Sequence, residues 1–364
     1  MSDKKSPMKP IAITLGDPAG IGPEIIAKAF RDAPQVTAGC FVVGDVATMR
    51  RAVGFVSGSQ IPWPVVQIDS AEDVKNTPPR AIPVLQIQEL ATLVPVGQIN
   101  GVAGEIAANA VVWAAKAALR GEIAALVTAP LHKEALAAAG PPHSRFPGHT
   151  EMLQFIAAEH LGKTTAELPV RMMLANDELR VVLVSIHVSL ADAIRAVTYD
   201  NVLQTLRIAH TSLRTMLGQE SGQKLGGKAR IGVAGLNPHA GEGGLFGREE
   251  IDVIAPAIAQ ARREGIDAHG PFAPDTVFMR ARAANGKPGE FDAVVAMYHD
   301  QGLIPVKYLG VEKGVNVTLG LPLVRTSPDH GTAFDIAGKG IADASSLIEA
   351  IRMAKVMVFS TGRP

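Results

Sequence analysis

The chain has 364 residues, of which 47% are hydrophobic and 19% are charged, so it has enough apolar material for a large core and about two domains. This composition excludes disordered and fibrous classes. The 35 Lys and Arg residues balance the 35 Asp and Glu residues, which disfavours nucleic-acid binding because no net positive charge attracts phosphates. Cys40 is the only cysteine, which excludes an intramolecular disulfide framework and predicts a cytoplasmic protein. No segment approaches the roughly 20 apolar residues of a membrane helix, so we expect no membrane association.

Short apolar runs rich in β-branched residues alternate with helical stretches along the chain. Such runs, bounded by glycine and proline, are typical of buried parallel strands in an α/β sheet. The predicted strands are residues 11–15, 40–44, 123–128, 181–186, 231–234 and 293–297. The clearest predicted helices are the Ala-rich residues 105–119 and 345–359, and the predicted surface loops are residues 57–64 and 218–227.

The first motif, GDPAGIGPE at residues 16–24, follows the first predicted strand. Gly20 and Gly22 permit close backbone approach and Pro23 suits a first helical position, so the segment predicts a strand-to-helix turn. Its amides could face an anion, or it could be an ordinary tight turn. It is not the dinucleotide fingerprint, because Ile25 stands where the third glycine belongs.

The second motif, FPGHTE at residues 146–151, is predicted to open a helix. Gly148 lets the backbone bend, so that His149 and Thr150 can point at one phosphate or carboxylate. The alternative is an ordinary helix cap, in which Thr150 or Glu151 satisfies first-turn amides.

Three histidines, His187, His239 and His299, each follow a predicted strand. Their spacing matches no local zinc motif, so shared ligation would have to come from the fold. Functional groups gather beyond the carboxyl ends of parallel strands, and we therefore predict a metal site there. The alternative is three unrelated structural histidines.

The last candidate set is Lys307, Asn316 and Arg325, spaced nine residues apart along a Gly-rich stretch. A lysine and an arginine beside a cleft can bind a phosphate, the arginine through two parallel hydrogen bonds. The alternative is a solvated charged surface.

Together these blocks carry a resemblance to a known family. The segments GDPAGIGPEI, FPGHTE, GLNPHAGE with LFGREE, GPFAPDTVF, YHDQGLIPVK and VNVTLGLPLVRTSPDHGTAFDIAGKG occur in family order between residues 16 and 340. They closely resemble the 4-hydroxythreonine-4-phosphate dehydrogenase family of vitamin B6 biosynthesis.

The resemblance implies an α/β, isocitrate/isopropylmalate-dehydrogenase-like fold of two α/β domains with an interdomain cleft. We expect residues 1–130 with 305–364 to form the first domain, on the cofactor side. Residues 131–304 are expected to form the second, with the dimer interface and the metal ligands. The resemblance further implies a homodimer with its active site at the interface, where one subunit supplies His187 and His239 and its partner supplies His299.

Site residues follow by motif. The resemblance assigns metal binding to the three histidines above. It assigns substrate binding to His149, Thr150, Lys307, Asn316 and Arg325. Asp275 and Asp300 match acidic positions near the active site, and with Lys307 they form the predicted catalytic set.

The implied reaction is an oxidation with decarboxylation of 4-phosphohydroxy-L-threonine to 3-amino-2-oxopropyl phosphate. The expected cofactors are NAD, with NADP as the alternative, and a divalent cation (Zn, Co, Mg or Mn). An all-imidazole ligand set favours zinc or cobalt over magnesium. One alternative is the same chemistry on a four-carbon sugar-acid phosphate, 4-phospho-threonate or 4-phospho-erythronate. A second is a metal-free protein that binds a phosphorylated ligand or transfers acyl groups.

Overall fold

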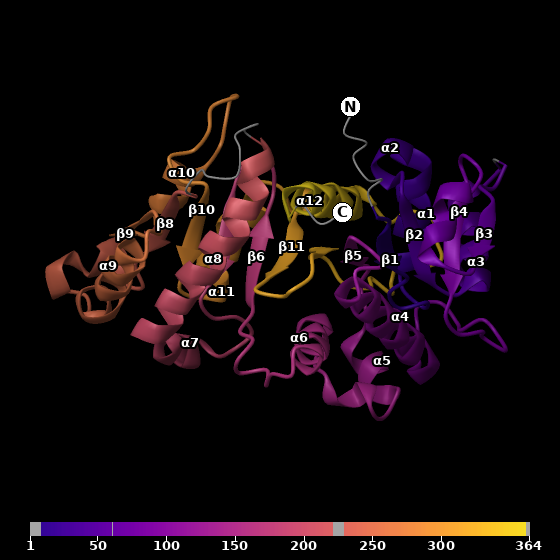
Figure 1. The fold of residues 1–364 in the computed structure, drawn as a ribbon, viewed down its shortest axis with the longest axis horizontal. Helices are drawn as coiled ribbons and strands as arrows, with labels where there is room; N and C mark the ends of the chain where they lie inside the picture. Colours follow the sequence, from indigo (N-terminus) through magenta and orange to yellow (C-terminus); the bar gives the residue numbers. More distant parts are fainter. Residues whose placement is uncertain (1–8, 60, 221–228, 362–364) are drawn as a thin grey trace, which may run out of the picture. The chain divides into compact units, whose positions relative to one another are not determined.

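A computed structural model of the chain describes residues 9–59, 61–220 and 229–361 (Figure 1). The chain divides into two compact units. Unit 1 comprises Met1–Pro169 and Leu321–Pro364, and unit 2 comprises Val170–Gly320. The first unit is discontinuous, and its boundaries fall after Pro169 and Gly320, where the prediction placed them after residues 130 and 304.

Helix packing and strand pairing explain the shifted boundaries. Helix α6 (His149–His160) buries Met152 and Leu153 in the same core cluster as helix α4 (Gly101–Leu119), so the segment after residue 130 stays with unit 1. Strand β11 (Val315–Leu319) pairs with a unit 2 strand, β6 (Arg171–Ala175). As a result His149 and Thr150 belong to unit 1, and Lys307 and Asn316 belong to unit 2.

Unit 1 contains a parallel sheet with the strand order β3-β4-β2-β1-β5-β12. Its strands are β1 (Ile11–Thr14), β2 (Cys40–Gly44), β3 (Val65–Ile68), β4 (Ile82–Gln86), β5 (Ala125–Thr128) and β12 (Arg325–Pro328). Its other elements are α1 (Gly22–Asp32), α2 (Pro34–Thr37), α3 (Val46–Ser57), η1 (Ala71–Asn76), α4, α5 (Lys133–Ala138), η2 (His143–Arg145), α6 and α12 (Ser345–Thr361).

The core of unit 1 lies between the sheet and helix α4, whose small alanine side chains let the helix approach closely. Ala107, Ala110 and Ala114 are buried, as are Phe41 and Leu126 from the strands. Helix α4 is long and apolar enough to span a membrane, but 61% of it is buried inside the protein, as expected of a core helix.

Unit 2 contains a mixed sheet with the strand order β11-β6-β7-β10-β8-β9. Strands β11, β6 and β7 pair antiparallel, whereas β7, β10, β8 and β9 pair in parallel. Its remaining strands are β7 (Arg180–Leu183), β8 (Ile231–Ala234), β9 (Ala268–Phe272) and β10 (Ala293–Ala296). Its helical segments are α7 (Leu190–Ala196), α8 (Tyr199–Glu220), η3 (Pro238–Gly244), η4 (Glu250–Ile254), α9 (Ala255–Arg263), α10 (Val277–Ala281), α11 (His299–Tyr308) and η5 (Val311–Lys313).

All six predicted strands are confirmed, with ends that differ by up to three residues. The remaining strands were not predicted from the sequence: β3, β4, β6, β9, β11 and β12. Both predicted helices are confirmed as α4 and α12. The predicted loop 218–227 lies mostly outside the described residues, and residues 218–220 end helix α8.

Candidate functional site

The three histidines lie beyond the carboxyl ends of adjacent parallel strands in unit 2, as predicted. His187 follows β7, His299 begins α11 after β10, and His239 lies in η3 after β8. Strand β10 pairs with both β7 and β8, so its histidine follows the middle strand of the three. Two of the histidines have left-handed backbone conformations, with φ of 37° at His187 and 51° at His239. Such strained conformations concentrate at functional sites.

His187 and His299 form a pair whose spacing fits a shared metal ion. Their ring centroids are 5.6 Å apart and the rings are tilted by 44°. With metal–nitrogen bonds of about 2.1 Å, two imidazoles on a tetrahedral metal have their ring centroids roughly 5 Å apart. The pair can therefore supply two ligands to one divalent cation.

The third histidine does not join this pair. Among the residues that the structure describes, no three His, Cys, Asp or Glu side chains come close enough together to hold a metal ion. The ring of His239 instead meets Phe246 edge-on, at a centroid distance of 6.2 Å. The predicted three-histidine cluster is therefore present as a pair, with the third histidine on the neighbouring strand end.

Two of these histidines have a carboxylate on the Nδ1 side of the ring. Asp300 Oδ1 lies 2.6 Å from His299 Nδ1, and Glu242 Oε2 lies 3.2 Å from His239 Nδ1. Metal-binding histidines commonly donate one ring N–H to a carboxylate, which leaves the other nitrogen free to ligate. The donor chemistry of both rings therefore suits a divalent cation bound through Nε2. Asp300 contacts His299 directly, so its position suits orienting the imidazole.

The resemblance implied that, across a dimer, His187 and His299 of one site come from different subunits, which stays a prediction. Within this one chain, the rings of the two histidines lie close together. The physical reason is that β7 and β10 are hydrogen-bonded neighbours in one sheet, so their carboxyl ends are adjacent.

The remaining predicted residues of unit 2 lie on separate elements. Lys307 is exposed in the last turn of α11, and Asp275 is exposed just before α10. Asn316 is half-buried in β11, opposite Leu174 of β6. Arg325, the third member of the nine-residue series, belongs to unit 1, so the series does not lie on one unit.

In unit 1 the main polar feature is the buried guanidinium of Arg325. The side chain is 3% exposed, and its Nε and Nη2 donate to Thr128 Oγ1 over 3.1 and 2.7 Å. Burial lowers the pKa of Arg325 to about 10, while the negative charge of Glu151 opposes that shift. Arg325 therefore remains charged at neutral pH.

His149, the first residue of α6, lies near this cation. Its Nε2 is buried and has no hydrogen-bond partner among the described residues. Burial, and secondarily the positive charge of Arg325, hold the pKa of His149 well below its usual range. The ring is therefore neutral at neutral pH and keeps an unused hydrogen-bonding nitrogen beside a buried positive charge.

The helix-cap interpretation of FPGHTE is not supported by the observed contacts. Helix α6 begins at His149 after Gly148, as predicted. Within the described part of the chain, no hydrogen bond joins Thr150 or Glu151 to the first-turn amides. The observed contacts are therefore compatible with a phosphate bound at this helix start.

The turn after β1 is closed by the chain's own atoms, which confirms the tight-turn interpretation. The Asp17 amide donates to the carbonyl oxygen of Pro130, and the Ile21 amide donates to that of Thr332. Within the turn, the Ala19 amide donates to Asp17 Oδ1 and the Gly20 amide donates to the Asp17 carbonyl oxygen. A Cβ at Gly22 would lie 2.6 Å from the carbonyl oxygen of Leu15, so glycine there serves packing. These amides are not available to a phosphate.

Two buried oxygen atoms at the end of β1 and in the turn after it were not predicted from the sequence. Asp17 and Thr14 are fully buried, and Asp17 Oδ2 and Thr14 Oγ1 have no hydrogen-bond partner among the described residues. Burial raises the pKa of Asp17 to about 6, although its bond from Ala19 and the nearby His132 oppose the shift. These buried polar groups could have been found from the sequence, because Thr14 and Thr128 are polar residues that end otherwise apolar strands.

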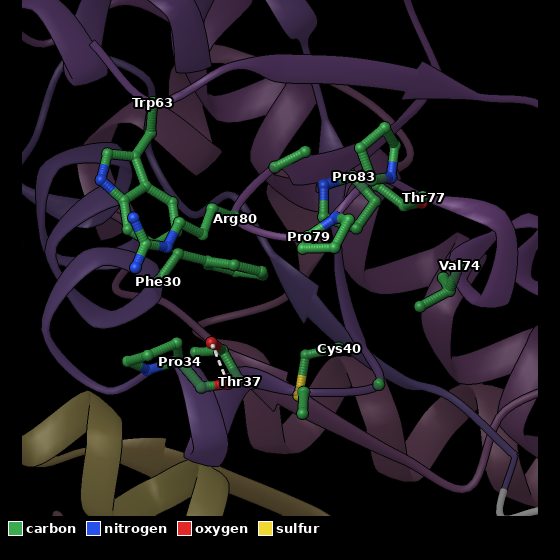
Figure 2. Close-up of a pocket in the computed structure, with 14 residues that line it drawn as sticks. Phe30, Pro34, Thr37, Cys40, Trp63, Val74, Thr77, Pro79, Arg80 and Pro83 are labelled. Carbon is green, nitrogen blue, oxygen red and sulfur yellow. Dashed lines mark hydrogen bonds between the residues drawn. The ribbon is translucent and has the colours of Figure 1, made fainter. Parts of the chain in front are cut away.

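A cavity of about 240 Å³ lies elsewhere in unit 1 and carries no catalytic set (Figure 2). Its walls include Phe30, Trp63, Pro83 and Cys40, with Arg80 as the one charged residue. Burial raises the pKa of the Cys40 thiol to about 12, so this cysteine is not a nucleophile at neutral pH. The cavity lies near the amino ends of β2 and β4, away from the strand ends that carry the site residues.

Comparison with known proteins identifies the family. The sequence matches the family described as pyridoxal phosphate biosynthetic protein PdxA over residues 37–354. A relative from Beijerinckia indica, named 4-hydroxythreonine-4-phosphate dehydrogenase, is 54% identical over 338 residues, covering 93% of this chain and 92% of the relative. A relative from Cupriavidus necator, named D-threonate 4-phosphate dehydrogenase, is 44% identical over 345 residues, covering 94% and 95%.

A solved structure agrees with the fold. The crystal structure of a 4-hydroxythreonine-4-phosphate dehydrogenase from Klebsiella pneumoniae has a TM-score of 0.80 and 39% sequence identity to this chain. The match covers 96% of this chain and 99% of that one. The predicted α/β fold class is thereby confirmed.

Proposed function

Because the chain belongs to the family of the pyridoxal phosphate biosynthetic protein PdxA, we propose that it is an NAD-dependent 4-hydroxythreonine-4-phosphate dehydrogenase. The reaction is the oxidation, with decarboxylation, of 4-phosphohydroxy-L-threonine to 3-amino-2-oxopropyl phosphate. The relative that shares 54% identity with this chain carries that enzyme's name, which favours this substrate.

The observation that carries the chemistry is the pair of His187 and His299 rings, 5.6 Å apart. When bound, a divalent cation stabilises the negative charge that develops on oxygen as a secondary alcohol is oxidised. We assign the His187 and His299 pair to that cation, with Zn or Co preferred over Mg and Mn on ligand type. The family motif also assigns His239, whose ring lies apart from this pair in the chain. Asp300 orients His299 through its Nδ1, at 2.6 Å.

The chain's own residues supply phosphate recognition and charge control. Arg325 is a buried, permanently charged donor, and His149 beside it offers the unused Nε2. A phosphate accepts hydrogen bonds from such groups and is attracted by the positive charge of the guanidinium. By the family motif, Thr150 of unit 1 is also assigned to substrate binding. In unit 2, the motifs assign substrate binding to Asn316 and to the exposed Lys307, which neutralises charge or transfers a proton. Asp275 is the remaining acidic candidate for proton transfer.

Oxidation of the hydroxyl on the carbon β to the carboxylate gives a β-keto acid, which loses carbon dioxide readily. When bound, NAD would accept the two electrons as hydride, and the protein would position its nicotinamide ring. NADP is the alternative cofactor. Because the four amides in the turn after β1 already have partners, we propose that the cofactor phosphates bind elsewhere.

We also assign a homodimeric state and a cytoplasmic location. Large apolar side chains flank the histidine loops and are exposed, including Val188 (55%), Leu190 (60%) and Phe246 (50%). Exposed apolar side chains grouped in this way are typical of an interface with another protein surface.

The second candidate substrate is D-threonate 4-phosphate, favoured by the relatives at 43–44% identity that carry that enzyme's name. Both substrates have a phosphate and an oxidisable hydroxyl, so the site described above serves either one. The discriminating experiment compares both compounds by NADH absorbance, with and without a chelator. Reduction with phosphohydroxythreonine at the higher kcat/KM supports the first assignment, and preference for threonate phosphate replaces it. A rate of NAD reduction that persists in the presence of the chelator would contradict the metal assignment. The absence of NAD reduction with either compound would indicate a ligand-binding or acyltransferring protein.

A further inference from the structure

The cavity of about 240 Å³ in unit 1 is separate from the candidate site (Figure 2). It lies near the amino ends of β2 and β4, whereas the buried hydroxyl groups of Thr14 and Thr128 end β1 and β5. Because these four strands are parallel, their amino and carboxyl ends lie on opposite edges of the sheet. None of the residues assigned to substrate or metal binding lines the cavity, so a ligand there would occupy a place of its own.

The walls of the cavity are mostly apolar and rigid. Two aromatic side chains line it, Phe30, which is 5% exposed, and the half-buried Trp63. Four prolines also line it: Pro34, Pro78, Pro79 and Pro83. In Figure 2, Trp63 and Phe30 lie on one side of the cavity, and Pro79 and Pro83 lie on the other. Flat aromatic surfaces favour contact with another planar ring.

Arg80 gives the cavity its charge. Of the described residues that line the cavity, Arg80 is the only one with a charged side chain, and its guanidinium has no hydrogen bond or ion pair with another described residue. A guanidinium presents a planar fork of N–H donors that matches a carboxylate or a phosphate. The exposed Arg80 therefore places an anion-binding group at the rim of an apolar cavity.

The backbone of Arg80 is strained, and glycine is the residue that its conformation favours. The Ala81 N–H donates to the carbonyl oxygen of Pro78 at 3.2 Å, which closes a turn with Pro79 second and Arg80 third. Arg80 has φ of 62°, and a positive φ after proline at this position is typical of a type II turn, which favours glycine there. Side chains held in such a conformation concentrate at functional sites. The strain therefore favours a function for the arginine side chain.

The volume of the cavity limits the size of its ligand. A cavity of roughly 150 Å³ holds a benzene ring, and pockets for drug-sized ligands begin at about 300 Å³. At about 240 Å³, this cavity lies between these sizes. It therefore fits one ring with a single small substituent.

We propose that this cavity binds a small aromatic anion, a single planar ring that carries a carboxylate or a phosphate. The ring packs between the aromatic side chains and the prolines, and the anionic group accepts hydrogen bonds from the Arg80 guanidinium. The charge and the flat walls together select this class over neutral rings and over anions without a ring. The proposal does not depend on the proposed function, because the two sites share no residue.

The test uses the full-length protein and two probes, benzoate and phenyl phosphate, titrated by isothermal titration calorimetry. The comparison compounds are benzyl alcohol, which is neutral, and cyclohexanecarboxylate and inorganic phosphate, which lack an aromatic ring. Fluorescence gives a second measurement at the cavity itself. The chain has two tryptophans, so Trp113→Phe leaves Trp63 as the only one that reports binding.

The most informative variant is Arg80→Gly, because it removes the guanidinium and relieves the strained turn at the same time. We expect it to weaken binding of the aromatic anions roughly 10- to 100-fold without lowering the melting temperature. Trp63→Leu should weaken binding roughly 2- to 10-fold. The matched control is Arg50→Ala, which removes an exposed arginine of α3 outside the cavity and should bind as the wild type does.

The outcomes separate this cavity from the proposed phosphate site at Arg325. Saturable binding of benzoate or phenyl phosphate that persists in Arg325→Ala and weakens in Arg80→Gly supports the proposal, and the tighter probe identifies the anionic group. The absence of saturable binding of both probes would overturn it, as would equal affinity for benzyl alcohol or cyclohexanecarboxylate. Binding that is lost in Arg325→Ala and unchanged in Arg80→Gly would also overturn it, because the probe would then occupy the substrate site.

Discussion

The guanidinium of Arg325 donates two hydrogen bonds to one oxygen atom, the hydroxyl of Thr128, although the two residues are 197 positions apart in sequence. Thr128 ends β5, and Arg325 begins β12, which pairs with β5 in parallel. The hydroxyl fixes the direction of the buried cation that we propose binds the substrate phosphate. This relationship explains why a threonine ends a strand whose other residues are apolar.

Replacing Arg325 with alanine should raise KM for the phosphorylated substrate more than it lowers kcat. The proposed bond to phosphate would be present in both the ground state and the transition state, so its loss would weaken binding in both. A charged hydrogen bond of about 1.5–3 kcal/mol corresponds to roughly a 10- to 100-fold increase in KM. Steady-state kinetics would measure it, with the surface variant Arg352→Ala as control. An unchanged KM would contradict the assignment of Arg325 to phosphate binding.

If the proposed homodimer builds each metal site from the His187 and His299 pair of one chain, mixing the His187→Ala protein with the His299→Ala protein should restore no activity. Because both rings lie within one chain, each site of a hybrid still lacks one of the two histidines. Each single variant should also lose metal, whereas His160→Ala, at the exposed end of α6, should keep it. Subunit exchange would be verified by mass spectrometry. Recovery toward half the wild-type rate per hybrid would show instead that the two histidines of one site come from different subunits.

Asp17 should make the folded protein less stable as pH rises through weakly acidic values. Its pKa is 3.8 in a model peptide and about 6 in the fold, so between these values the folded state holds a proton that the unfolded chain releases. Relative to Asp17→Asn, the wild type should therefore lose about 3 kcal/mol of unfolding free energy across this window. Urea unfolding at a series of pH values measures the difference. The exposed-acid variant Asp252→Asn should show no comparable trend, and a flat difference for Asp17→Asn would contradict the assignment.

His149 should have the opposite effect on the pH dependence of stability. Its pKa lies well below 6.5 in the fold, so below pH 6.5 the unfolded chain takes up a proton that the folded protein does not. The wild type should therefore lose stability relative to His149→Gln by up to about 1.4 kcal/mol for each pH unit below 6.5. The same urea series measures it, with His160→Gln as the exposed control. Equal slopes for the wild type and His149→Gln would show that the ring is freely protonated.

Much of the fold class was predictable because local sequence patterns report local structure. The run at residues 40–44 predicted β2 with its ends, and the run at 231–234 did the same for β8. The strands that were missed have a physical explanation. Strand β9 contains Gly270 and Pro271, which interrupt the apolar pattern, and β12 has the polar sequence RTSP although all four residues are buried.

The candidate site was predictable at the level of residue types and strand ends. Parallel strands place their carboxyl ends along one edge, which is why His187, His239 and His299 could be assigned to one edge of a sheet. The motif order was sufficient to predict the family, and the comparisons confirm it.

The sequence by itself therefore determined the α/β class, the family and the strand ends that carry the candidate residues. Only the tertiary structure decided that His187 pairs with His299 in the same chain, that the amides after β1 are already bonded, and that Arg325 donates to Thr128. The physical reason is that these contacts join residues far apart in the chain, such as Thr128 and Arg325, 197 positions apart. Such contacts depend on strand order and on which polar groups are buried together, and neither is encoded in the spacing of residues along a single segment.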